Sequence, residues 1–405
     1  MSFQQGLSGL FAASQNLDVI GNNVANSSTV GFKASDAIFA DVYANSLAGG
    51  GQTGPGIGVA VTTVQQNFAQ GNIQTTSNPL DVAINGDGFF RLDTNGTVTF
   101  SRNGQFHLDS DGFIVNSTGS KVTGYGVDAN GNVVVSNAAP LQVSMTPLKA
   151  QSTAVASIGV NLDAREPVIA KPFNAADSTT YNKATSMTVY DSQGNPHAFT
   201  TYYVKTASNT WGVYGAMDGT VLAAQIGTLN FNTDGTLKNG TPALPFNISA
   251  AIPAGPVTPL AFTLDYPGAT QFGSDFAVST LTQDGFTSGQ LSGFSIGPDG
   301  TIVGRYTNGE TRNLGEMLLV NFPNANGLQP IGNNQWAQTS ESGQPVPGSP
   351  GSGNLGVLQS GAVEQSNVDL TQELVDMITA QRVYQANAQT IKTQDQIMNT
   401  LVNLR

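Results

Sequence analysis

The sequence predicts a mainly β protein, in which nested, discontinuous antiparallel β domains lie between long N- and C-terminal α-helices. Two observations support this fold class. Asn-Gly and Asp-Gly turns recur through the middle of the chain, and heptad stripes of apolar residues occupy its two ends. We expect the two helices to pair in a coiled-coil-like inner layer, because an isolated amphipathic helix is marginal in water until its apolar stripe packs against a neighbour.

The N-terminal helix is predicted from apolar and small residues that recur at steps of three and four. This stripe consists of Phe3, Leu7, Leu10, Ser14, Leu17, Gly21 and Val24. Ser2 and Gln5 have the spacing of a capping box, in which the hydroxyl accepts from an early helix N–H and the glutamine reaches back to the chain start. The helix is therefore expected to begin almost at the terminus.

The C-terminal helix is predicted in the same way, with Asp369 and Gln372 as its candidate cap. Its stripe runs through Leu370, Leu374, Met377, Gln381, Tyr384, Ala388 and Ile391 and continues, after a register shift, through Ile397, Leu401 and Leu404. No Gly or Pro follows Asp369, so one helix of about 35 residues, roughly 50 Å long, is expected. We predict that both helices are partly disordered in the monomer and become ordered in an assembly.

The stripes have an alternative reading as ordinary helices packed on a core. Their positions at the two extreme ends, the length of the second helix and the low charge favour assembly. The expected assembly residues are Phe3, Leu7, Leu10, Leu17 and Val24 at one end and Leu370, Leu374, Met377, Tyr384, Ile391, Ile397, Leu401 and Leu404 at the other.

The region between the helices is predicted to be antiparallel β structure. Its Asn-Gly and Asp-Gly dipeptides supply the positive φ angles of type I′ hairpins, and alternating segments such as Val98 with Phe100 flank them. Composition divides the chain into nested layers. These are 1–25 with 367–405 (inner helices), 26–70 with 340–366 (connecting segment), 71–145 with 285–339 (inner β domain) and 146–284 (outer β domain). The Gly-rich segments 46–58 and 344–353 are expected to be flexible connections.

Composition excludes several classes of protein. Only 10% of the 405 residues are charged and the formal net charge is −12, which argues against binding to a nucleic-acid backbone. The absence of cysteine excludes disulfides and thiolate chemistry. The N-terminus lacks the basic and apolar regions of a cleaved signal peptide, and no apolar run is long enough to insert in a membrane.

No catalytic, cofactor or metal site is predicted. Asp128, Asn130 and Asn132 have the spacing of calcium ligands, but Val133 stands where the loop requires Gly, so hairpin geometry is the preferred interpretation. His107 and His197 lie in separate predicted strands without metal-binding spacing and are read as ordinary strand or surface residues. We therefore expect a protein that is not an enzyme and has no cofactor.

The stretch LDVIGNNVANSSTVGFKAS, Leu17 to Ser35, resembles the N-terminal motif of the bacterial flagellar axial proteins, the rod and hook family. The matching positions are Asn22, Asn23, Ala25, Asn26, Thr29, Gly31, Phe32 and Lys33. Residues 366–389 look like the paired C-terminal motif. Within the family, residues 281–315 and 327–336 are most similar to the hook branch.

The resemblance implies a structural subunit of a curved, flexible tube, the extracellular hook, which acts as a universal joint and transmits torque from rod to filament. It also implies export through the flagellar type III channel without a cleaved signal peptide. The implied partners are further copies of the chain, the rod, the hook cap, the hook–filament junction and export proteins. Two alternatives stay open: a distal rod protein with an inserted domain, and a secreted β-rich carbohydrate-active enzyme or adhesin.

The motif itself is expected to end the helix and lead the chain out of the inner layer. Asn22, Asn23, Asn26 and Gly31 tolerate left-handed backbone geometry. Phe32 is expected to anchor the turn, and Lys33, the first cationic side chain, to mark the start of a more solvated region.

Overall fold

The computed structural model describes residues 2–42, 56, 58–128, 131–135, 137–222, 224–238, 244–251 and 259–403. Most of the Gly-rich segment 46–58 lies outside these residues, as do Asn130 and Leu404. Leu401 falls within a described helix, but its side chain is not described. The chain divides into two compact units. Unit 1 comprises Met1–Ser144, Phe294–Gly304 and Arg312–Arg405, and unit 2 comprises Met145–Gly293 and Arg305–Thr311.

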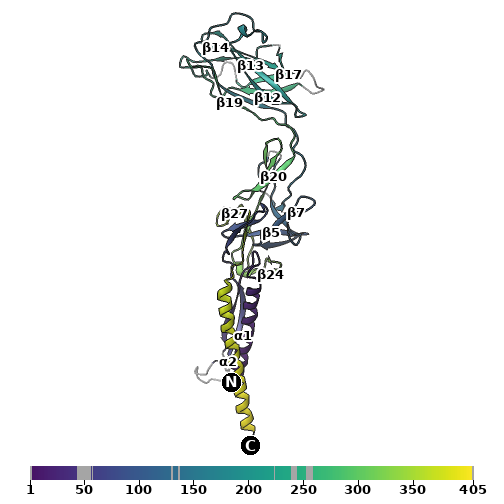
Figure 1. The fold of residues 1–405 in the computed structure, drawn as a ribbon, viewed down its shortest axis with the longest axis vertical. Helices are drawn as coiled ribbons and strands as arrows, with labels where there is room; N and C mark the ends of the chain where they lie inside the picture. The colour runs from purple at the N-terminus through teal and green to yellow at the C-terminus, as the bar shows by residue number, and fades with distance from the viewer. Residues whose placement is uncertain are drawn as a thin grey trace. The chain divides into compact units, whose positions relative to one another are not determined.

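The terminal helices form as predicted and pack against each other in unit 1 (Figure 1). They are α1 (Ser2–Ala25) and α2 (Leu370–Asn403), and α2 has 34 residues. Asp369 caps α2, since its Oδ1 accepts from the backbone N–H groups of Thr371 at 2.9 Å and Gln372 at 3.2 Å. The two helices run antiparallel, because Asn23 contacts Glu373 while Gly6 lies against Ile391.

Both glutamines of the predicted caps point elsewhere. Gln5 donates its side-chain N–H to the backbone carbonyl of Gly56, and Gln372 donates to the carboxylate of Asp376, one turn further along α2. In a capping box the glutamine oxygen would instead accept from the backbone N–H at the helix start. The part of the capping-box prediction that concerned the glutamines was wrong.

A large antiparallel sheet, most of whose residues belong to unit 1, contains many of the strands. Its main path follows the order β20-β21-β22-β9-β5-β6-β25-β24, with further strands paired at its sides. Two smaller pairs, β27 with β4 and β28 with β3, join the returning chain to the outgoing one, and a hairpin of β1 and β2 follows α1. The strands are β1 (Ser35–Val42), β2 (Gly58–Gln66), β3 (Ile73–Thr75), β4 (Val82–Asn85), β5 (Phe89–Thr94), β6 (Thr97–Ser101), β7 (Phe106–Leu108), β8 (Ile114–Asn116), β9 (Lys121–Tyr125), β10 (Ala139–Pro140), β20 (Leu291–Ile296), β21 (Thr301–Tyr306), β22 (Thr311–Met317), β23 (Leu319–Asn321), β24 (Gln329–Gly332), β25 (Gln335–Ala337), β26 (Val346–Gly348), β27 (Val357–Ser360) and β28 (Ala362–Glu364). A 3-10 turn spans Ala325–Gly327.

Unit 2 consists of two sheets that share one core. The first follows the order β17-β18-β11-β19, and the second follows β12-β13-β14-β15 with β16 beside β14. The strands are β11 (Val155–Asn161), β12 (Lys183–Tyr190), β13 (Pro196–Ala207), β14 (Thr210–Met217), β15 (Thr220–Val221), β16 (Gly227–Asn230), β17 (Phe246–Ala250), β18 (Leu260–Asp265) and β19 (Ala277–Gln283), with a 3-10 turn at Ser178–Thr180. Trp211, Tyr203, Phe199 and Tyr266 are fully buried in the core. The pairing of β11 with β18 is parallel, a departure from the expected antiparallel arrangement.

The turns keep the predicted glycines but not always the predicted type. Asn95 and Gly96 both have positive φ, as a type I′ hairpin requires. At Gly112, Gly194, Gly235 and Gly300 only the glycine has positive φ. An Asp or Asn side chain earlier in the turn instead accepts from backbone N–H groups, as Asp109 does from Phe113 at 2.8 Å. Such side-chain bonds favour longer turns with one left-handed residue over the two-residue type I′ turn.

The segment 344–353 is more ordered than its composition predicts. Val346–Gly348 forms β26, which pairs with β23, and Ser352 closes a turn by donating its backbone N–H to Ser349 at 3.1 Å. The glycines allow close packing here, since an added side chain at Gly348 would lie 2.7 Å from Leu355. The expectation of a flexible loop was wrong at this position.

Candidate assembly site: the terminal helices and their anchor

Small residues on α1 bring the two helices close together. A Cβ added at Gly9 would lie 2.8 Å from the side chain of Asn387, and one added at Gly6 would lie 3.2 Å from Ile391. Ala12, Ala13 and Ile20 are buried on the same side of α1. The intramolecular helix contact therefore uses the small-residue face of α1, which permits close approach of the backbones.

The predicted N-terminal stripe lies largely outside this intramolecular contact. Phe3 and Leu7 are 50% and 37% exposed, and Leu10, Leu17 and Val24 are half-buried. Phe11, which borders the stripe, is 61% exposed. Three bulky apolar side chains on one short helix thus have no full cover within the described chain.

The C-terminal stripe divides between two environments. Met377 and Ile391 are half-buried and Ala380, which the stripe omitted, is buried against α1. Leu370, Leu374, Tyr384 and Ile397 are exposed by between 37% and 47%. Val375, Ile378 and Met398 are exposed as well and were missed, because they lie off the heptad positions.

The motif after α1 is a chain of specific hydrogen bonds. Asn26 donates its side-chain N–H to the carbonyl of Asn22 at 3.0 Å and accepts from the hydroxyl of Thr29 at 3.2 Å. Gly31 has φ +72, and a Cβ there would lie 2.6 Å from the backbone nitrogen of Asn103. The predicted turn is present, and glycine is required at Gly31 for both backbone geometry and space. The expected left-handed geometry was wrong for Asn22, Asn23 and Asn26, which have no positive φ.

Asn23, near the C-terminal end of α1, is hydrogen-bonded to both β1 and α2. Its side chain exchanges two hydrogen bonds of 2.9 Å with the backbone of Ser35 at the start of β1, and donates to Glu373 of α2 at 2.9 Å. Burial, reinforced by the nearby Asp36 and Asp376, raises the pKa of Glu373 above its ordinary value, while the bond from Asn23 opposes the shift. Asn23 is buried, so this motif position links the terminal helices to the hairpin.

Lys33 is buried, which corrects the expectation that it marks a solvated region. Its Nζ lies 2.7 Å from Oε1 of Glu364 and 2.7 Å from the carbonyl oxygen of Ala69. Glu364 also accepts from Arg102 at 3.3 Å and from the backbone N–H of Gly71 at 2.8 Å. Lys33, the only cation of the motif, pairs with Glu364, which lies 331 positions away. Local sequence cannot predict a partner at that separation.

This buried cluster of Lys33, Arg102 and Glu364 holds two cations for one carboxylate. Burial lowers the pKa of Lys33 and that of Arg102, although Glu364 opposes both shifts. Breaking such a cluster on one side leaves an uncompensated charge in the interior. The cluster therefore fastens the segment after α1, strand β28 and the loop after β6 to one another. Glu364 was missed, and its only sequence signal was a carboxylate inside the apolar run of β28.

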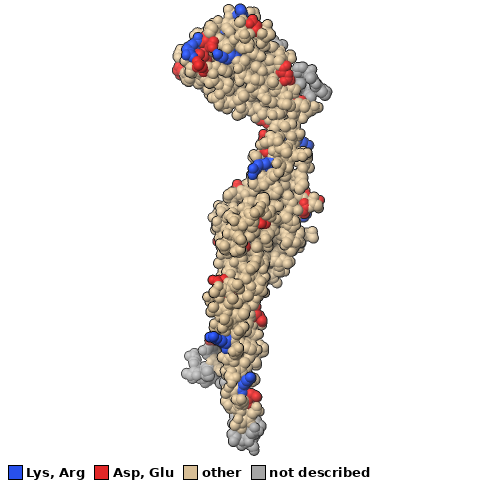
Figure 2. All heavy atoms as spheres, viewed as in Figure 1, with Lys and Arg blue, Asp and Glu red and all other residues tan. Residues whose placement is uncertain are grey.

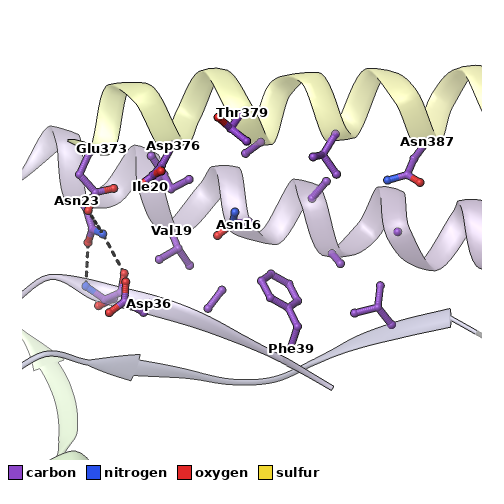
Figure 3. A pocket seen from close by; sticks show the side chains of 18 residues that line it. Asn16, Val19, Ile20, Asn23, Asp36, Phe39, Glu373, Asp376, Thr379 and Asn387 are labelled. Carbon is purple, nitrogen blue, oxygen red and sulfur yellow. Dashed lines mark hydrogen bonds between the residues drawn. The ribbon is translucent and has the colours of Figure 1, made fainter. Parts of the chain in front are cut away.

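A groove runs along α1 between α2 and the β1–β2 hairpin (Figure 3). Its volume is about 490 Å³, and Ala12, Ala13, Asn16 and Ile20 lie along its floor. Phe39 of β1 and Val383 of α2 form part of its walls and are 40% and 48% exposed. Asp36, Glu373 and Asp376 line one end of the groove.

His197 lies in strand β13 of unit 2, between two carboxylates. Its Nδ1 lies 2.7 Å from Oδ2 of Asp218 and its Nε2 lies 3.5 Å from Oδ2 of Asp191. Burial lowers the pKa of His197, but the two carboxylates outweigh it and the net shift is upward. Among the described residues no group of His, Asp or Glu side chains has the arrangement of a metal site.

The surface carries few charges. Figure 2 shows Lys, Arg, Asp and Glu in small, scattered groups on an otherwise uncharged face. Within the described part of the chain, no helix combines the length and the apolar character needed to cross a membrane. This scarcity of charge agrees with the 10% charged residues of the sequence.

Four family models match the chain in succession. Residues 3–33 match the flagella basal body rod protein model and residues 83–161 the flagellar hook protein FlgE/F/G D1 domain. Residues 161–286 match the flagellar basal body protein FlaE D2 domain, and residues 359–404 the C-terminal model of the flagellar basal body rod FlgEFG proteins. The matches begin and end on the terminal helices and cover both units.

Whole-length relatives agree with these models. The flagellar hook protein FlgE of Escherichia coli strain K12 is 46% identical over 413 residues, with 100% of both chains covered. The FlgE protein of Borreliella burgdorferi is 33% identical over 440 residues, covering 100% of this chain and 99% of the relative. The crystal structure of Helicobacter pylori flagellar hook protein FlgE2 shares the fold, with a TM-score of 0.58 over 72% of this chain and all of that one, at 14% identity. The chain belongs to the flagellar hook protein family.

Proposed function

We propose that this chain is the hook subunit of its flagellum and polymerises through the exposed residues of α1 and α2. The observation that carries the proposal is the apolar surface left on the terminal helices, above all Phe3, Leu7 and Phe11. Soluble monomers rarely keep contiguous apolar patches without a partner. The family is one of structural subunits of a self-assembling axial structure, and chemistry on a substrate has no part in this proposal.

The nested layers belong to the same proposal. The helices 1–25 and 367–405 form the inner layer, residues 26–70 with 340–366 connect it outward, 71–145 with 285–339 form the inner β domain and 146–284 the outer one. The buried cluster of Lys33, Arg102 and Glu364 supports this scheme, because it ties an outgoing segment to a returning one. The outer domain then slides over its neighbours through uncharged polar contacts as the tube bends and rotates.

Export and terminal partners complete the proposal. Helices that gain their full burial only in the polymer have little tertiary structure to lose during passage through a narrow type III channel. The tube then grows below a hook cap, from the rod toward the hook–filament junction, and transmits torque between them as a universal joint.

Polymerisation of the purified full chain tests the function directly. Electron micrographs should contain curved tubes, and straight, stiff tubes would favour a distal rod protein. Removing residues 2–24 should prevent tubes because it removes the predicted N-terminal packing helix. Replacing Leu10 or Leu401 with Asp should also prevent them, because an unpaired carboxylate resists burial in an apolar interface. Tubes of normal yield from all three variants would refute the role of the helices.

A further inference from the structure

We propose that the groove beside α1 receives the ridge formed by Phe3, Leu7 and Phe11 of a second copy of this chain. The inference rests on the proposed function, since it requires the chain to polymerise. It adds a specific pair of surfaces to the general statement that the terminal helices assemble.

The ridge and the groove lie on opposite faces of the same helix. Phe3, Leu7 and Phe11 follow one another at intervals of four and so form one stripe. Ala12 on the groove floor stands nine positions after Phe3, which is two and a half turns at about 3.6 residues per turn. One copy can therefore insert its ridge into a neighbour while its own groove receives the ridge of the next.

The two surfaces match in size and in chemistry. The ridge from Phe3 to Phe11 spans eight helical steps, about 12 Å, and the groove floor from Gly9 to Asn23 spans fourteen steps, about 21 Å. Alanines on the floor leave room for bulky side chains, in the manner of knobs entering holes. Phe39 on the wall is 40% exposed and offers an aromatic partner to an incoming phenylalanine.

A contact between the ridge of one copy and the groove of the next is compatible with a tubular polymer. A contact between two different surfaces of identical subunits is heterologous, and it produces open helical arrays unless the rotation closes a ring. A two-fold contact of ridge with ridge would instead stop at a dimer. The placement of ridge and groove on opposite faces of α1 thus favours a second copy, oriented like the first, as the occupant.

Disulfide mapping in the polymer tests the inference, and the chain is suited to it because it has no cysteine. Full-length Phe11→Cys and Val383→Cys chains, one carrying a mass tag, are mixed with an excess of unmodified chain, whose intact ridges drive assembly, and are then polymerised and oxidised. Both positions are exposed, at 61% and 48%, so the substitutions should not disturb folding. A disulfide requires Cα atoms within about 7 Å, so ridge–groove packing predicts a mixed dimer that appears in tubes and is absent from unpolymerised chains.

A matched control uses Ile378→Cys in place of Val383→Cys. Ile378 is 52% exposed on the same helix but does not line the groove. Phe11→Cys should form much less mixed dimer with Ile378→Cys. If either first variant fails to polymerise, Leu7→Cys with Phe39→Cys replaces the pair.

Labelling with a maleimide separates the remaining outcomes. Val383→Cys should react in the free chain and lose its reactivity in tubes. Tubes in which Val383→Cys stays reactive, or is protected without linking to a ridge position, would overturn the inference and leave the proposed function intact. Failure of the unmodified chain to form tubes would instead refute the proposed function.

Discussion

The terminal helices of unit 1 and the core of unit 2 differ in how far their large apolar side chains are buried. In unit 2, Trp211, Tyr203 and Tyr266 are almost completely buried, and Trp211 donates its indole N–H to Gln271 at 2.9 Å. On α1, Phe3 and Phe11 are at least half exposed. The comparison teaches that unit 2 buries its large aromatic side chains within one chain, whereas the helix pair leaves several apolar side chains uncovered, as the proposed assembly requires.

The largest expected effect on stability comes from removing a large buried side chain from the core of one unit while the core of the other unit stays unchanged. Trp211→Ala should destabilise unit 2 by about 3–5 kcal/mol, because it leaves a large cavity and removes the donor to the side-chain oxygen of Gln271. Calorimetry should show one transition falling while the transition of unit 1 stays in place. Trp336→Ala is the mirror variant, since Trp336 is buried in the core of unit 1. If either variant lowers both transitions equally, the two units are not energetically separate.

Removing the charge of Glu364 should weaken unit 1 alone. Glu364→Gln removes the carboxylate that Lys33 and Arg102 share and leaves only Asp87 as an opposite charge near Arg102, at a cost of about 3 kcal/mol. Thermal unfolding should show the loss in the unit 1 transition, and tubes should become harder to form because the segment after α1 loses its anchor. Asp275→Asn is the control, since that carboxylate is 97% exposed in its ion pair with Arg165 and its loss should leave both transitions unchanged. A Glu364→Gln chain as stable as the parent would contradict the anchoring role.

Replacing an exposed phenylalanine should prevent assembly when the residue lies on α1, but not when it lies in unit 2. Phe11→Ser should change the free energy of unfolding of the monomer by less than about 0.5 kcal/mol, because the side chain is already largely solvated. It should nevertheless abolish tubes, as measured by sedimentation and electron microscopy. Phe272→Ser replaces a side chain that is 47% exposed in unit 2 and should leave assembly intact. Equal loss of tubes from both variants would show that exposed apolar area in general, rather than the ridge, drives polymerisation.

The sequence predicts the parts of this molecule whose causes are local. Heptad spacing, the Asp369 cap and the glycine turns all depend on residues within a few positions, and the helices and the β character of the middle were predicted correctly from them. The position of Lys33 could not be predicted, because Glu364 reaches it through a pairing of β28 with β3 that joins distant segments. The ion pairs of His197 could not be predicted for the same reason, since Asp218 lies beyond the next strand. Its interpretation as a strand residue agrees with its position in β13.

The face of α1 that packs within the subunit shows a second limit of sequence reasoning. A stripe of large residues predicts which face is apolar, but Gly6 and Gly9 decide which face a partner helix can approach most closely. Small residues contribute little to an apolar pattern and much to the distance between helices. The large stripe therefore marks an apolar face of α1, while Gly6 and Gly9 set the approach of α2, and the apolar pattern alone could not separate these two roles.

The smallest expected effect is a pH dependence confined to unit 2. His197 has a folded-state pKa raised above 6.5, so its protonated form stabilises the fold fully below about pH 6.5, and this contribution is lost as the pH rises through the raised value. Asp191 and Asp218, whose pKa values are lowered, remain ionised throughout that interval. The transition temperature of unit 2 should fall slightly across it in the parent chain and not in His197→Gln, while unit 1 stays constant in both. Imidazole proton signals that titrate at or below pH 6.5 would contradict the assignment, because bonds of 2.7 Å to Asp218 and 3.5 Å to Asp191 favour the charged ring.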